Sequence, residues 1–147
     1  MMTIRQLGAL ALVLGLTATA GAAEKDPLAS TLRKVMEDNV AAYNARDVDA
    51  VMRGVHTRSP EYDTTKTAVA AQFREVQARA RVLDFDLIGH DDEFAYARLQ
   101  LAVGGPPTGN FQDDVVDSLL VFHQENGTWK LWTDEVLGVQ FVKFVDK

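Results

Sequence analysis

The 147-residue sequence contains no cysteine, and this absence removes several options at once. A disulfide framework, a lipid-modified N-terminal cysteine and a cysteine nucleophile are all excluded. Basic residues are also few, with 15 Lys and Arg against 21 Asp and Glu, and they form no cluster. Because nucleic acids and anionic membrane surfaces attract clustered basic side chains, we expect neither as a partner.

Long apolar runs are confined to the N-terminus. Residues 7–16 form an apolar stretch, which is shorter than the ~20 residues that a membrane-spanning helix needs. Arg5 precedes this stretch and Ala20-Gly21-Ala22 follows it, a pattern typical of a secretory signal peptide. We therefore expect cleavage after residues 1–22. The remaining single domain, residues 23–147, is then periplasmic or secreted and has no contact with the membrane.

Recognisable catalytic and metal-binding motifs are also lacking. The sequence has no G-x-S-x-G element and no glycine-rich phosphate loop. Its three histidines, His56, His90 and His123, do not have the close spacing of metal ligands, and the last two lie beside turns, where we expect them to be solvated. We predict no metal and no cofactor.

Helical periodicity occupies the first half of the domain. Asp26-Pro27 is typical of an N-cap followed by proline in the first turn, and apolar residues then recur at helical spacing. The predicted helices cover residues 27–45, a short segment capped by Asp47 and ending near Arg53, and a third segment capped by Thr64 or Thr65.

From Arg81 onward the apolar period falls to two, as in a strand. Asn126-Gly127 is the dipeptide best suited to a type I′ hairpin turn, because both positions require positive φ. Helices followed by antiparallel strands indicate an α+β domain. The first predicted strand begins at Arg81, and three more cover residues 94–103, 111–124 and 128–133. We expect the last strand to extend through residues 136–145, with a bulge at Gly138.

Three short segments occur in a distinctive order along the chain. They are Tyr43-Asn44-Ala45-Arg46-Asp47-Val48-Asp49-Ala50, Ser59-Pro60-Glu61-Tyr62 and Gly127-Thr128-Trp129-Lys130-Leu131-Trp132. Together they resemble the nuclear transport factor 2-like (NTF2-like) superfamily, in particular its SnoaL-like bacterial branch. The resemblance implies an α+β cone, in which a curved antiparallel sheet encloses the N-terminal helices and a pocket, and often a dimer. It implies no single activity, because the superfamily includes isomerases, cyclases, dehydratases and proteins without catalysis.

Two residues are candidate catalytic bases. The resemblance to ketosteroid isomerases implies a base at Asp63, although Asp63 can equally cap the third helix, and we favour the cap. The same comparison places the isomerases' Tyr donor at Asn39. His56, in the loop before Asp63, is the other candidate base, and the alternative is an inert loop histidine.

A second group of polar residues is expected on neighbouring strands. Arg98 and Asp117 can form a cross-strand pair that either binds a polar ligand group or lies on a solvated or dimer-forming face of the sheet. Trp129 and Trp132 fall on opposite faces of their strand, so only one of them can line a pocket.

The sequence favours an exported NTF2-like protein whose pocket binds a small, partly apolar ligand. One alternative is a cofactor-independent lyase or isomerase that uses Asp63 or His56, and another is a dimeric interaction module. We expect a homodimer through the outer face of the sheet. The predicted ligand-binding residues are Tyr62, Tyr96, Arg98, Asp117 and Trp132.

Overall fold

The structure is a computed structural model that describes residues 25–105 and 114–141. Predictions for residues 1–22, 106–113 and 142–145 lie outside the described residues. The described elements follow the order helices, then strands: α1 (Pro27–Asn44), α2 (Val48–Arg53), α3 (Tyr62–Glu75), β1 (Arg79–His90), β2 (Phe94–Gly104), β3 (Asp114–Glu125) and β4 (Thr128–Phe141).

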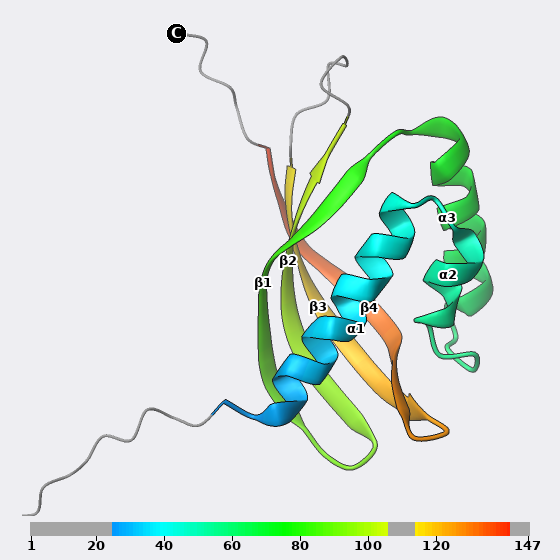
Figure 1. The fold of residues 1–147 in the computed structure, drawn as a ribbon. Helices are drawn as coiled ribbons and strands as arrows, with labels where there is room; N and C mark the ends of the chain where they lie inside the picture. Colours follow the sequence, from blue (N-terminus) through cyan, green and yellow to red (C-terminus); the bar gives the residue numbers. More distant parts are fainter. Residues whose placement is uncertain (1–24, 106–113, 142–147) are drawn as a thin grey trace, which may run out of the picture.

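The four strands form one antiparallel sheet in the order β1-β2-β3-β4. α1 runs diagonally across one face of this sheet, while α2 and α3 lie to one side (Figure 1). This arrangement confirms the predicted α+β class and the curved antiparallel sheet around N-terminal helices. None of the helices in the described ranges is long and apolar enough to cross a bilayer.

The core lies between α1 and the face of the sheet that it covers, here called the inner face. Leu32 and Met36 of α1 pack in one cluster with buried residues of β2 and β3. On each strand these residues are two positions apart, which is the spacing of side chains on one face. The strand members of the cluster are Ala95, Ala97, Leu99, Leu120 and Phe122. The residues between them define the outer face.

Local sequence signals account for several turns and caps. Asn126 and Gly127 have φ angles of 52° and 79°, as the predicted hairpin turn requires. The side chain of Asp26 accepts from the N–H of Leu28 at the start of α1, and that of Asp47 accepts from Ala50 at the start of α2. Both predicted N-caps are therefore confirmed.

The predicted start of α3 was wrong. This helix begins at Tyr62, and its N-cap residue, Glu61, makes no capping hydrogen bond through its side chain. The chain turns earlier because the hydroxyl of Ser59 accepts from the N–H of Glu61, and the carbonyl of Ser59 accepts from Tyr62. Asp63 consequently lies inside the first turn, and the predicted cap at this residue is incorrect.

Candidate functional site

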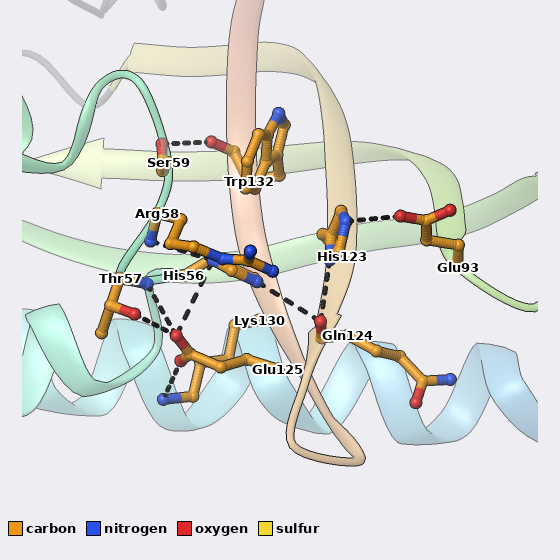
Figure 2. Close-up of polar contacts among 10 residues, drawn as sticks. All are labelled: His56, Thr57, Arg58, Ser59, Glu93, His123, Gln124, Glu125, Lys130 and Trp132. Carbon is orange, nitrogen blue, oxygen red and sulfur yellow. Dashed lines mark hydrogen bonds and ion pairs between the residues drawn. The ribbon is translucent and has the colours of Figure 1, made fainter.

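The loop between α2 and α3 is fastened to β4. Val55 forms an isolated parallel bridge with Leu131, and the N–H of His56 donates to the Leu131 carbonyl at 2.8 Å. The Ser59 hydroxyl donates to the Trp132 carbonyl at 2.6 Å (Figure 2). These bonds hold the loop, with its candidate base His56, against the first half of β4.

His56 is completely buried, and both of its ring nitrogens are engaged. The N–H of Arg58 donates to Nδ1 at 3.0 Å, which leaves the ring proton on Nε2. Nε2 lies 3.3 Å from the carbonyl oxygen of Gln124, which can accept that proton (Figure 2). A general base needs a free nitrogen, whereas both ring nitrogens of His56 contact backbone groups that connect the loop to the sheet. A role of His56 as a base stays a prediction.

Glu125 also connects the loop after α2 to the sheet. Its carboxylate accepts from the Lys130 ammonium at 2.8 Å, and from both the hydroxyl and the N–H of Thr57. The hydrogen bonds from Lys130 and Thr57 lower the pKa of Glu125 to about 2. Glu125 is therefore ionised at neutral pH and links the loop after α2 to the β3–β4 hairpin.

His123 is buried rather than solvated, contrary to the expectation from its place beside a turn. Its Nδ1 lies 2.8 Å from the Gln124 carbonyl oxygen, and its Nε2 lies 3.1 Å from a carboxylate oxygen of Glu93. The ring stacks on Trp132, with centroids 4.9 Å apart. His90 is partly exposed, as expected. Trp132 is thus held in an aromatic cluster, whereas Trp129 packs against the core, so the prediction that the two lie on opposite faces is confirmed.

The outer face of the sheet carries the predicted cross-strand pair. Arg98 Nε lies 2.8 Å from Asp117 Oδ1, and the second nitrogen–oxygen contact makes the pair bidentate. Tyr96 shares this face and is 42% exposed. Because α1 covers the opposite face, Tyr96, Arg98 and Asp117 lie outside the space between helix and sheet. Their predicted role in ligand binding stays a prediction.

The inner face continues beyond the part that α1 covers. Asp134 is paired directly with Leu120 of the core and therefore lies on the inner face. Further along β4, Val136, Val139 and Phe141 pair with Ser118, Val116 and Asp114 on the same face. The three apolar side chains are 51%, 44% and 69% exposed, respectively. We call Asp134, Val136, Val139 and Phe141 the open half of the inner face.

Asp134 is the residue of the open half whose carboxyl has a shifted pKa. The residue is exposed, yet partial desolvation of its carboxyl raises the pKa, and the nearby carboxylates of Glu61 and Glu135 raise it further. Glu61 is positioned by the Thr133 hydroxyl, which donates to its carboxylate at 2.9 Å. A carboxyl in such surroundings is held toward its neutral form, in which it can donate a hydrogen bond.

α3 has no buried side chain. It is attached through Phe73, whose ring meets that of Tyr43 edge-on at 5.2 Å, with the Arg46 guanidinium 5.4 Å from the Phe73 centroid. In Figure 1, α3 stands away from the strands, next to the end of α1. This helix is therefore held by its ends and by one aromatic pair rather than by a packed core.

The remaining predicted site residues lie apart from the open half. Asp63 is exposed on the first turn of α3, and Tyr62, half-buried, is the first residue of that helix. Asn39, at the position where the resemblance implies a Tyr donor, donates to the Val51 carbonyl at 2.9 Å and joins α1 to α2. The structure thus gives Asn39 a structural contact, while the catalytic assignment of Asp63 stays a prediction.

Asp134 is the residue that sequence reasoning missed. A usable signal was present, because Asp134-Glu135 interrupts an otherwise apolar strand between Leu131 and Val139. Strand alternation then places Asp134 on the face opposite that of Glu135. Which of the two faces is covered by helices could not be derived from this pattern.

The open half combines apolar side chains with one carboxyl that is held toward neutrality. This part of the sheet therefore presents both apolar contact area and a hydrogen-bonding group to solvent. Within residues 25–105 and 114–141, no three His, Asp or Glu side chains are grouped so that they could hold a metal ion.

Solved structures that are similar to this chain include NTF2-like proteins. They include an NTF2-like protein of unknown function from Shewanella oneidensis (TM-score 0.58, 11% identity, 73% of this chain and 96% of that chain). A candidate dehydratase of the NTF2-like family from Streptomyces avermitilis gives a TM-score of 0.61 at 12% identity, covering 73% and 93% of the two chains. A protein with a cystatin-like fold from Nostoc punctiforme gives 0.62 at 11% identity, covering 73% and 87%. The fold of this chain is therefore NTF2-like.

A match to a family model identifies one family within this fold class. Residues 34–142 match the model described as the C-terminal domain of the anti-sigma-I factor RsgI9. The chain belongs to this family. No curated protein matches the sequence.

Proposed function

We propose that this chain is an exported NTF2-like binding protein that holds a small, partly apolar ligand on the open half of its inner face, without catalysis. The observation that carries this proposal is the exposed apolar group Val136, Val139 and Phe141 beside Asp134. Export rests on the predicted signal peptide in residues 1–22. The family match supports binding, since it is to a domain of a regulatory protein, an anti-sigma-I factor.

The chemistry of the open half defines the ligand class. The carboxylates of Glu61 and Glu135 lie close enough to raise the pKa of Asp134, so an anionic ligand is disfavoured there. A neutral ring compound with a hydroxyl or carbonyl oxygen fits better, because it brings no further negative charge next to these carboxyl groups.

The test compares 2-naphthol with 2-naphthoate, a matched neutral and anionic pair, by NMR titration of the mature protein. We expect 2-naphthol to bind more tightly and to shift the amide signals of residues 134–141. Val139→Ser should weaken 2-naphthol about fivefold, because it removes apolar contact area. Leu83→Ser, at another exposed aliphatic residue, should not change binding. Equal binding to the wild type and Val139→Ser would contradict the proposal.

A lyase or isomerase is the second candidate function, and Asp134 favours it. The pKa of the Asp134 carboxyl is raised, and a carboxyl with a shifted pKa is a candidate for proton exchange with a bound substrate. The Streptomyces avermitilis structure is that of a candidate dehydratase, which is in keeping with this chemistry. In this case Asp134→Asn should abolish turnover of a cyclic ketone or alcohol and leave its binding intact. If binding is the only function, no turnover should be detected in either protein.

The same variant reports on the electrostatics of the site. The raised pKa of Asp134 means that its contribution to stability is fully present below pH 3.8 and is lost as the pH rises through the folded-state pKa. Asp134→Asn should therefore increase stability at pH 7 more than at pH 3. Denaturant midpoints at the two pH values give this comparison and also show that the variant is folded.

A further inference from the structure

A groove of about 710 Å³ runs between α1 and β1, away from the open half. One wall is a stripe of α1 with helical spacing: Asp26, Ala29, Ser30, Arg33 and Glu37. The other wall is the run of β1 residues from Asp84 to His90. This volume lies within the range of sites that bind ligands.

The groove follows the edge of β1, as its lining shows. Phe85 and Leu87 belong to the inner face and Asp84 and Asp86 to the outer face, yet all four line the groove. Consecutive residues from both faces border one groove only where the strand's edge forms its wall. β1 is an edge strand of the sheet, and no described strand pairs with the side of β1 that faces away from β2 (Figure 1). Backbone groups of β1 therefore have no strand partner at this edge among the described residues, and the N–H of Phe85 donates to the Asp84 carboxylate at 3.0 Å.

We propose that this groove binds an extended, basic peptide segment of a partner protein as an additional strand beside β1. A helix lying next to a free sheet edge offers an added strand both backbone hydrogen bonds and a wall for its side chains. The α1 stripe from Asp26 to Glu37 spans about 16 Å and the β1 run about 20 Å. About six extended residues fit this length.

The charge of the lining selects a basic peptide. The groove contains four carboxylates, from Asp26, Glu37, Asp84 and Asp86, against two lysine or arginine side chains. Glu37 is already paired with Arg33, and Asp26 with His90. Among the described residues, Asp84 and Asp86 form no ion pair with a lysine or arginine; Asp86 is the cross-strand neighbour of Arg98, whose guanidinium pairs with Asp117. Acidic side chains on an edge disfavour apolar or acidic strands and attract basic ones.

Two bulges limit the added strand. The pairing of β1 with β2 shifts between Val82 and Asp84 and again between Leu87 and Gly89. Bulges interrupt the ladder on an edge strand, so only the regular stretch Asp84–Leu87 can pair with a partner. A short ladder makes the interaction weak and dependent on the side chains of the α1 stripe.

The probe is an acetylated and amidated hexapeptide of alternating Lys and Val, titrated into the mature protein. We expect saturable binding that shifts the amide signals of Asp84–Leu87 and slows their hydrogen exchange. The same peptide with Glu in place of Lys should not bind. A peptide that is N-methylated at every residue should also fail to bind, because it cannot donate ladder hydrogen bonds.

Charge variants locate the site. Asp84→Asn combined with Asp86→Asn should weaken the Lys-Val peptide about fivefold, as expected for the loss of two solvent-exposed ion pairs. Asp92→Asn, in the β1–β2 turn outside the groove, is the matched control. Absence of binding at millimolar peptide, equal binding of the N-methylated peptide, or amide shifts confined to the outer face would each overturn the proposal.

Discussion

His90 and Asp26 are joined by a hydrogen bond at the end of the β1 groove, where His90 Nε2 lies 2.7 Å from Asp26 Oδ2. The hydrogen bond to Asp26 raises the pKa of His90 above 6.5. The N–H of Leu28 and then the bond to His90 lower the pKa of Asp26 below 3.8. The contribution of Asp26 to stability is therefore present above pH 3.8, and that of His90 is lost as the pH rises through its raised pKa.

This pair gives a prediction at the residue scale. In Asp26→Asn the N-cap acceptor is kept, because asparagine caps nearly as well as aspartate, but the charge facing His90 is removed. We expect the NMR titration midpoint of His90 to fall toward 6.5 in this variant. Asp38→Asn, which removes an exposed carboxylate elsewhere on α1, serves as the control. A midpoint that is the same in the wild type and in Asp26→Asn would show that the pair does not form in solution.

The helices differ in how their first turns are stabilised. Asp47 accepts from the N–H of Ala50 at 2.9 Å and caps α2, whereas Asp63 lies within the first turn of α3 and makes no capping bond. Asp47→Ala should therefore lower the free energy of unfolding by about 0.5–2 kcal/mol. Asp63→Ala should cost only the favourable interaction of a negative charge with the helix N-terminus, about 0.3–1 kcal/mol.

Denaturant unfolding of the two alanine variants tests this difference between elements. Asp47→Asn is the control, because asparagine preserves the cap, and it should remain close to the wild type. A larger loss for Asp63→Ala than for Asp47→Ala would mean that α3 begins at a later residue in solution.

The predicted homodimer is expected to form through the outer face of the sheet. α1 covers part of the inner face, while Tyr96 remains 42% exposed on the outer face, next to half-buried aliphatic side chains of β3 such as Leu119 and Val121. Burial of this surface against a second copy would remove apolar area from water. The homodimer that the sequence suggested therefore remains a prediction with a defined surface.

Sedimentation equilibrium at micromolar concentration tests this prediction at the scale of the molecule. The mature protein should have twice the mass of one chain, and Tyr96→Lys should shift it toward the monomer by placing a charge in the contact. Ile88→Lys alters a side chain that is more exposed, at 61%, but lies beside the α1 groove, and this change should leave the dimer intact. A wild-type protein that sediments as a monomer would exclude this interface.

The sequence by itself determined features that depend on residues a few positions apart. The caps at Asp26 and Asp47 and the hairpin turn at Asn126-Gly127 follow from bonds and φ angles within four residues. Alternation along the strands likewise separated Trp129 from Trp132, because successive side chains point to opposite faces.

Only the tertiary structure decided the site. The start of α3 depends on Ser59, whose hydroxyl bonds to Trp132, 73 positions away in the sequence. His56 is buried because residues of β3 and β4 close over it, and local polarity around the loop gave no sign of this. Asp134 acquires its raised pKa from partial burial and from Glu61, which the fold brings alongside it. Such properties arise from contacts between distant segments, and no local pattern encodes which segments will meet.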